Sequence, residues 1–181
     1  MAKGVKHVMK VGDLEFNISH EEQGLPIIRG MLLEFQPELI IEFGTSKGGF
    51  TWILHSTLPD VELHTYDLKH IAAQKRIKKH MNDNVHFHTC DILSKPLPEV
   101  LKELCKDSRK KLLYCDNGNK QLEIELYSGF LNKDDIIGCH DYGKEVHWEN
   151  IKDYLLTFEA HNVNIDLKRE NCMSRFWVKG E

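Results

Sequence analysis

The sequence predicts an α/β fold, with a doubly wound, mostly parallel sheet of about seven strands and helices on both faces. Two observations lead to this prediction. Between residues 37 and 137, short apolar runs alternate with longer amphipathic stretches, which is the pattern of repeated β-α units. Several of the apolar runs also end at an acidic residue, and the carboxyl ends of the strands are where ligands bind in such sheets.

The parallel strands are expected where the apolar runs are bounded by Gly, Asp or Asn. These runs cover residues 39–43, 61–66, 85–89, 111–115 and 135–139. The amphipathic stretches between and after them predict helices at residues 50–57, 70–81, 99–106, 120–131 and 148–160.

Both ends of the chain lie outside this alternation. Runs at residues 162–168 and 172–179 flank a polar turn at 169–171, which predicts an antiparallel C-terminal β-hairpin. Residues 20–35 predict a helix that begins or breaks near Pro26 and lies across the sheet. We expect this helix to belong to an N-terminal cap segment, residues 1–36.

Length and charge set limits on the class of protein. The chain has 181 residues, with 24 Lys and Arg, 28 Asp and Glu, and a formal net charge of -4. This length predicts one domain over residues 1–181. The negative charge gives no reason to expect nucleic acid or an anionic membrane as a partner. No apolar run is long enough to span a bilayer or to form the core of a signal peptide, so we expect a cytoplasmic protein.

The cysteines predict no disulfide framework and no zinc site. They number five, an odd count, and contain no Cys-x-x-Cys pair. We expect reduced thiols that pack as small apolar side chains, at Cys90, Cys105, Cys115, Cys139 and Cys172.

A glycine-rich turn follows the first predicted parallel strand, in the order Gly44-Thr45-Ser46-Lys47-Gly48-Gly49. Backbone N–H groups and the positive end of the next helix then face a ligand above the strand. Ser46 stands where a dinucleotide site has its middle glycine, which argues against a pyrophosphate. A phosphate-binding Gly-Lys-Ser/Thr sequence is also missing. The turn therefore favours a ligand without a pyrophosphate.

Acidic residues stand at or just after four successive strands, at Glu42, Asp67, Asp91 and Asp116. A single Asp in such a place is equally well explained as a helix N-cap. Together, the four predict one acidic crevice at the carboxyl edge of the sheet. Asp67 lies 23 residues beyond Gly44, about where such folds hold a ribose diol.

These motifs resemble those of class I S-adenosylmethionine-dependent methyltransferases. The later segments, Asp116-Asn-Gly-Asn-Lys120 and residues 131–142, are similar to the group of macrocin O-methyltransferase and cephalosporin hydroxylase-like proteins. The resemblance covers roughly residues 22–145. It implies a Rossmann-like fold, S-adenosylmethionine as cofactor, and O-methyl transfer to a small hydroxylated molecule.

The resemblance also implies roles for single residues. Glu42 would lie near the amino acid end of the cofactor, Asp67 would bind the ribose hydroxyls with Leu68 packing nearby, and Asp116 would border the cofactor. Asp91 and Ile92 would border the adenine. The methionine portion would be lined by Gly44, Thr45, Ser46, Gly48 and Gly49.

A divalent metal is the second implied ligand. Asp116 and the pair His140-Asp141 follow adjacent predicted strands, and the resembled proteins place magnesium at these strand ends. Magnesium prefers oxygen ligands. His140 departs from that pattern, and favours a softer metal or no metal, with the imidazole as general base. Lys120 is a further candidate base if its pKa is lowered; the alternative is an exposed lysine at a helix start.

Two other functions stay open at this point. One is an NAD(P)-dependent oxidoreductase on a related sheet, which Ser46 argues against. The other is a non-catalytic binding protein that retains the methyltransferase fold. A homo-oligomer is compatible with each of the three readings, because a second subunit can complete a small pocket.

Two further patterns, one of histidines and one of basic residues, give little support to a functional site. His86 and His88 share one face of a strand expected near the sheet edge, but with no third ligand in view a metal role is disfavoured. A basic run at residues 75–80 predicts a solvated helix face.

Overall fold

The computed structural model describes residues 7–11, 14–18, 20–69 and 72–181, and it confirms the predicted fold class. Five parallel strands are followed by β9, which is antiparallel to both of its neighbours. The sheet has the order β5 (Val85–Thr89), β4 (Glu62–Asp67), β3 (Leu39–Phe43), β6 (Lys111–Cys115), β7 (Ile136–Cys139), β9 (Arg175–Lys179) and β8 (Phe158–Ala160). Because the chain leaves β3 in one direction and returns to β6 on its other side, the strand order reverses between β3 and β6, where such folds bind ligands.

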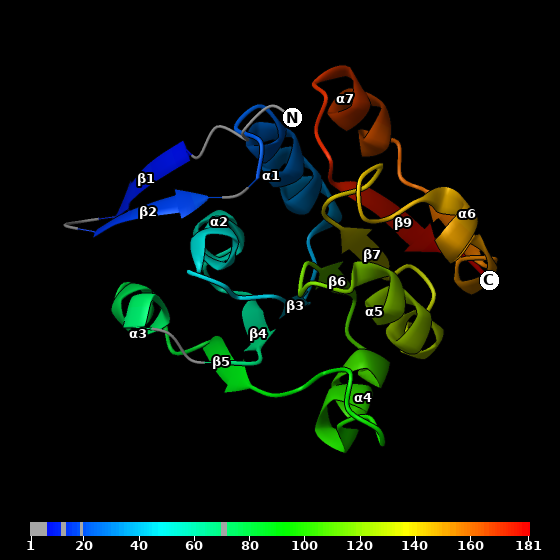
Figure 1. Ribbon diagram of the computed structural model, residues 1–181, viewed down its shortest axis with the longest axis horizontal. Helices are drawn as coiled ribbons and strands as arrows, with labels where there is room; N and C mark the ends of the chain where they lie inside the picture. Colours follow the sequence, from blue (N-terminus) through cyan, green and yellow to red (C-terminus); the bar gives the residue numbers. More distant parts are fainter. Residues whose placement is uncertain (1–6, 12–13, 19, 70–71) are drawn as a thin grey trace.

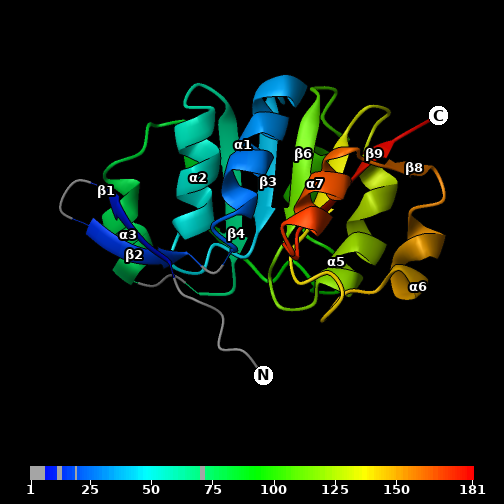
Figure 2. The same ribbon diagram turned by 90° about the horizontal axis from the view of Figure 1, so that it is seen from above.

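Helices cover both faces of the sheet (Figures 1 and 2). One face carries α1 (Gly24–Phe35), α2 (Gly49–Thr57), α3 (Ala72–Lys78) and α7 (Val163–Arg169). The other carries α4 (Glu99–Lys106), α5 (Lys120–Tyr127) and α6 (Trp148–Ile151). Strands β3 and β6 are buried along their whole length between these two apolar layers, which is why they read as continuous apolar runs.

The predicted C-terminal hairpin is wrong in its first strand. Residues 163–168 lie in α7, because Val163 and Leu167 are one helical turn apart and buried, while Ile165 is 59% exposed. The alternation of these three apolar residues with polar ones is typical of a strand, which is why the sequence predicted one. The outer antiparallel neighbour of β9 is instead β8, which lies inside the predicted helix 148–160. That segment forms only α6 and a 3₁₀ turn, Lys152–Tyr154, before β8.

The N-terminal segment also differs from the prediction. It contains a two-stranded antiparallel sheet, β1 (His7–Val11) and β2 (Leu14–Ile18), which lies at one side of the main body (Figure 1). The predicted helix 20–35 begins only at Gly24, and it ends at Gln36 in a left-handed conformation with φ 50°. In the predicted helix 70–81, α3 is shorter, and residues 70–71 lie outside the described residues.

Several strand and helix bounds, and the state of the cysteines, agree with the prediction. Strands 39–43, 85–89 and 111–115 and helix 99–106 have the predicted bounds, and the predicted helix 120–131 is α5 followed by a 3₁₀ turn, Ser128–Phe130. All five cysteines are free thiols, as predicted. Within the described ranges, no helix has the length and apolar character needed to cross a membrane.

A buried ion pair joins the starts of β6 and β7. Lys111 Nζ donates to Asp135 Oδ2 at 2.6 Å, and the two side chains are 0% and 1% exposed. Asp135 also accepts hydrogen bonds from the backbone N–H groups of Lys111 and Asn132. Removing one partner of such a pair leaves an uncompensated buried charge.

We predict that Lys111→Met lowers the free energy of unfolding by about 3 kcal/mol, because Asp135 then stays buried without its cation. Urea denaturation followed by circular dichroism measures the change. Lys133→Met is the matched control, since Lys133 pairs with Glu181 at 55% and 88% exposure and its loss is expected to cost less than about 0.5 kcal/mol. Equal stability of Lys111→Met and the control would contradict the prediction.

Candidate functional site

The glycine turn after β3 brings the end of that strand against the end of β6. Gly44 has φ +98°, and its N–H donates to the Tyr66 carbonyl at 2.8 Å. A Cβ at this position would lie 2.3 Å from the backbone oxygen of Asp116, so only glycine fits. The close approach of these two backbones places Asp116 directly beside the turn.

Asp67 is tied to the same turn. Its Oδ2 accepts a hydrogen bond from the backbone N–H of Ser46 at 2.8 Å, and its Oδ1 accepts one from Lys69 at 3.3 Å. Ser46 is held in a left-handed conformation with φ 46°. The carboxylate predicted to bind a ribose is therefore oriented by the loop that precedes α2.

Glu42 lies beneath the turn and is 1% exposed. Its Oε2 accepts hydrogen bonds from Thr51 Oγ1 at 2.6 Å and Thr65 Oγ1 at 2.5 Å, while its Oε1 is buried without a hydrogen-bond partner among the described residues. Burial raises the pKa of Glu42 to about 7, although the two threonine hydrogen bonds oppose this rise. A buried carboxyl with one unused oxygen is suited to a ligand that brings a donor.

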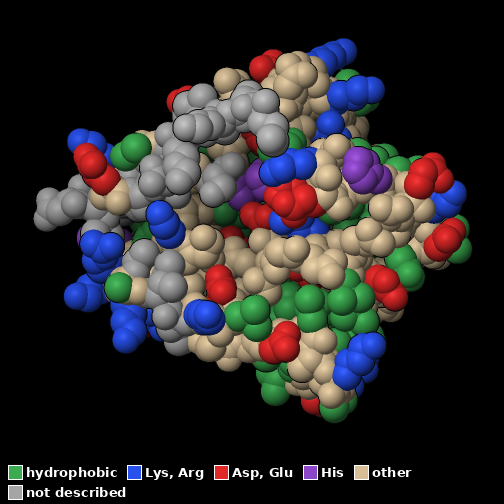
Figure 3. Space-filling view, viewed as in Figure 1, with side chains coloured by type: hydrophobic (Ala, Val, Ile, Leu, Met, Phe, Trp, Pro, Cys, Tyr) green, Lys and Arg blue, Asp and Glu red, His purple; other side chains and the backbone are tan. Residues whose placement is uncertain are grey.

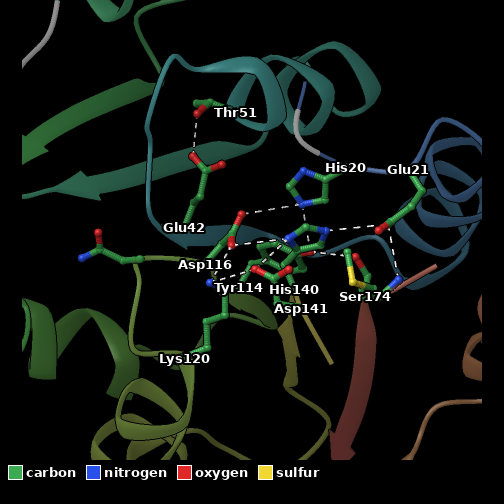
Figure 4. Close-up of polar contacts among 12 residues, drawn as sticks. His20, Glu21, Glu42, Thr51, Tyr114, Asp116, Lys120, His140, Asp141 and Ser174 are labelled. Atoms are coloured by element: carbon green, nitrogen blue, oxygen red, sulfur yellow. Dashed lines mark hydrogen bonds and ion pairs between the residues drawn. The ribbon is translucent and has the colours of Figure 1, made fainter. Parts of the chain in front are cut away.

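Asp116, His140 and Asp141 converge, as predicted, and Lys120 lies among them (Figure 4). His140 Nδ1 lies 3.6 Å from Asp116 Oδ1 and 3.5 Å from Asp141 Oδ2. Lys120 Nζ lies 3.3 Å from Asp116 Oδ1, 3.1 Å from Asp141 Oδ2 and 2.9 Å from Glu145 Oε2. The lysine side chain is only 5% exposed, so its ammonium group is held by these carboxylates.

The protonation states follow from this arrangement. Burial opposes the charge of His140, but its contacts with Asp116, Asp141 and Glu21 outweigh burial and raise its pKa to about 11. Burial likewise opposes the charge of Lys120, but its contacts with Glu145, Asp116 and Asp141 raise its pKa above the ordinary value. Neither alternative offered for Lys120 holds, because its pKa is raised rather than lowered and its side chain, at the start of α5, is only 5% exposed; both side chains are cations at neutral pH.

The sequence did not indicate three members of this cluster. His20 stacks on Phe50 with ring centroids 4.0 Å apart, and its Nε2 lies 3.0 Å from the Tyr114 hydroxyl. Burial and the charge of His140 hold the pKa of His20 well below its usual value, so His20 is neutral. Glu21 Oε2 lies 3.7 Å from His140 Nε2, and Glu145 contacts Lys120. These residues stand before α1 and in a loop, where no periodic pattern marks them.

The remaining predicted residues lie around the turn and along the next strands. Gly48 has φ +82° and precedes Gly49 at the start of α2, and Thr45 Oγ1 lies 2.6 Å from Thr65 Oγ1. Leu68 is 54% exposed beyond β4. Asp91 Oδ1 accepts a hydrogen bond from Leu93 N–H at 3.0 Å, and the Ile92 side chain is fully buried in the apolar layer with α4 and α5.

One cavity borders the charged cluster at Asp116, and a second is lined by Tyr142, the residue after Asp141. A small one, about 30 Å³, lies between the glycine turn, His20, Phe50 and Asp116. A larger one, about 550 Å³, has walls of Tyr142, Trp148, Trp177 and Arg175, and Tyr142 directly follows Asp141. In the space-filling view, acidic side chains gather near the middle of the face beside basic and histidine side chains, while lysines and arginines gather at the side occupied by α3 (Figure 3).

The cluster fits magnesium poorly. The donor atoms that come within 4.8 Å of one another belong to His20, Asp116 and His140, two nitrogens and one carboxylate, whereas magnesium prefers oxygens. Asp141, predicted as a ligand, is outside this group. The Lys120 ammonium already occupies the point at which Asp116, Asp141 and Glu145 could offer their oxygens to an ion.

Comparisons with known proteins identify the fold. No protein-family model and no curated protein matches the chain. CmcI in its N160 apo form has a TM-score of 0.68 and 13% identity, over 92% of this chain and 74% of CmcI. A Staphylococcus aureus protein described as a caffeoyl-CoA O-methyltransferase has a TM-score of 0.63 and 15% identity, over 88% and 84%.

A third structure extends this likeness. It is the Burkholderia thailandensis 1,6-didemethyltoxoflavin-N1-methyltransferase, with 1,6-didemethyltoxoflavin and S-adenosylhomocysteine bound. Its TM-score is 0.57 and its identity 9%, over 88% of this chain and 80% of that one. The chain therefore shares a fold used by methyltransferases, and the predicted resemblance is confirmed at the level of the fold.

We predict that Glu42→Gln removes a pH-dependent cost of burial. The pKa of Glu42 is raised from 4.5 to about 7 in the folded protein, so its contribution to stability is lost as pH rises through this interval. Relative to wild type, the variant is expected to gain about 3 kcal/mol in the free energy of unfolding between pH 4.5 and pH 7.5. Urea denaturation across this range measures it, with exposed Glu159→Gln as control. A difference that does not change with pH would count against the prediction.

Proposed function

We propose that the chain is an S-adenosylmethionine-dependent methyltransferase that methylates a hydroxyl group of a small molecule. The observation that carries this proposal is the meeting of the glycine turn, Asp67 and the Asp116 cluster at the point where the strand order reverses. This juxtaposition supports a site for a nucleoside with a cationic amino acid end, adjacent to a charged centre that can hold an acceptor oxygen.

The residues around the turn fit the cofactor. Asp67 offers a carboxylate for the ribose hydroxyls, and the unpartnered Oε1 of Glu42 suits the ammonium of the methionine portion. When bound, S-adenosylmethionine supplies an electrophilic methyl group. The cavity of about 30 Å³ is smaller than the roughly 300 Å³ or more of typical ligand sites, so binding requires the lining of the cavity, which includes the stacked pair His20 and Phe50, to open.

The aromatic cavity fits the acceptor. Trp148 and Trp177 stack with ring centroids 6.4 Å apart, and Arg175 lies 5.4 Å from the centre of the Tyr142 ring. Flat apolar walls with a cation at one side suit an aromatic acceptor. Tyr142, one wall of the cavity, directly follows Asp141 in the chain, and this adjacency is the reason for assigning the acceptor to this cavity.

Lys120 and His140 supply positive charge where the reaction creates a negative oxygen. Their charges lower the pKa of a bound hydroxyl and stabilise its oxyanion, which is the task a metal performs in metal-assisted transfer. The hydroxyl proton leaves to water, while Asp116, whose Oδ1 lies within 3.6 Å of both cations, keeps the two cations in place. The acceptor oxygen then forms its bond to the methyl carbon as the carbon–sulfur bond breaks. This account needs no divalent ion.

The cofactor assignment predicts binding of S-adenosylhomocysteine. Calorimetric titration of the wild-type chain should show it, and Asp67→Ala should weaken it by roughly tenfold to a hundredfold, because charged hydrogen bonds to the ribose are lost. Asp60→Ala, an exposed acid in the turn after α2, is the matched control. A folded wild-type chain that binds NADH and not S-adenosylhomocysteine would favour the oxidoreductase alternative and overturn the proposal.

The metal-free assignment predicts that Lys120 excludes magnesium. Lys120→Met leaves Asp116, Asp141 and Glu145 without their shared cation, so the variant should bind Mg²⁺ at least about tenfold more tightly than wild type in a calorimetric titration. Lys144→Met, which removes a 64% exposed lysine 3.4 Å from Asp141, should change the affinity little. Tighter binding of Mg²⁺ by wild type than by Lys120→Met would contradict a cationic role for the lysine.

A further inference from the structure

A second cluster of metal-binding side chains lies on the edge of the sheet, away from the candidate functional site. Glu62 and His64 are two residues apart on β4 and therefore share a face, and His86 on β5 is the register partner of His64. The His64 and His86 ring centroids are 4.6 Å apart. One donor atom from each of the three residues lies within 4.8 Å of the other two. Strand pairing therefore brings two ligands from β4 to His86, and His88 is not one of the three.

We propose that Glu62, His64 and His86 form a binding site for a zinc ion at the β4–β5 edge of the sheet. Two imidazole nitrogens and one carboxylate oxygen are a donor set that zinc takes in proteins, with a fourth position left to water. Magnesium and calcium, which prefer oxygens, are disfavoured here. None of the three side chains is buried, so an ion can reach them from solvent.

The outer contacts of the cluster are those of a built metal site. His64 Nδ1 lies 3.0 Å from His88 Nε2, and the two rings are stacked, so the ring nitrogen that would not bind zinc is already held. Glu62 Oε2 accepts a hydrogen bond from Arg109 at 2.8 Å, which leaves Oε1 for the ion. Arg109 is shared with Asp107, at 2.9 Å, so it does not neutralise Glu62 alone.

The contact between the ligands shows what zinc would replace. His64 Nε2 and Glu62 Oε1 are 2.6 Å apart and share a proton. Two ligand atoms on a tetrahedral zinc ion are about 3.3 Å apart, so binding requires release of this proton and an increase of about 0.7 Å in the distance between the two atoms. Zinc at this position would link edge strand β5 to β4, and would stabilise the fold by mass action.

Zinc titration of the tag-free, metal-stripped chain tests the site. In calorimetry at pH 7.5, wild type should bind Zn²⁺, and His86→Ala should weaken this binding roughly tenfold or more. His80→Ala, which removes an exposed histidine outside the cluster, should bind like wild type. The thermal midpoint should rise with Zn²⁺ in wild type and His80→Ala, and should rise less in His86→Ala.

Asp116→Asn separates this site from the candidate functional site, which has two histidines of its own. The edge site predicts that Asp116→Asn retains the binding that His86→Ala loses. Because His86 is on an edge strand and not buried, circular dichroism of His86→Ala should match wild type. Equal Zn²⁺ binding by wild type and His86→Ala, loss of binding in Asp116→Asn alone, or no binding by wild type would each overturn the proposal.

Discussion

The candidate site depends on a charge balance in which two cations, Lys120 and His140, are surrounded by four carboxylates. Neither cation is solvated, since each side chain is 5% exposed, so each is stabilised by the acidic groups around it. The same contacts raise the pKa of both cations and hold the pKa of Asp141 below its usual range, chiefly through His140. The result is a centre that stays charged in the pH range where most proteins work.

The backbone brings this centre together. Parallel strands β3, β6 and β7 end at one edge of the sheet, and the glycine at position 44 lets the turn after β3 touch the backbone of Asp116. Asp141 follows β7 in a left-handed conformation with φ 56°, which turns the chain back so that its carboxylate reaches Lys120. Part of the chain's excess of acidic residues is therefore concentrated at this site, where the charges of the carboxylates exceed those of the two buried cations.

Sequence patterns predicted most of the parallel sheet and the convergence of Asp116, His140 and Asp141. Strands such as 39–43 and 111–115 are buried on both faces, so they appear as uninterrupted apolar runs bounded by polar residues. The predictions for the β8 and α7 segments were wrong. In α7, the spacing of Val163, Ile165 and Leu167 fits a strand as well as one turn of a helix. The spacing of apolar residues along the chain does not distinguish a strand from a helix here, because packing against the sheet determines which one forms.

Contacts between distant segments explain what the sequence could not predict at the two clusters. His20 comes from the segment before α1, and its place beside His140 depends on how that segment packs over the sheet. The pairing of His64 with His86 depends on strand register, which no spacing within either strand records. The protonation of Lys120 depends on Glu145 as well as on the two predicted aspartates.

A crystal structure of the chain grown with S-adenosylhomocysteine and excess magnesium tests the central claim most directly. The account predicts the ribose on Asp67, the sulfur facing the Asp116 cluster, and the Lys120 ammonium still in contact with Asp116 and Asp141. A magnesium ion in the place of the Lys120 ammonium, with the lysine displaced, would contradict a cationic centre built from the chain's own side chains.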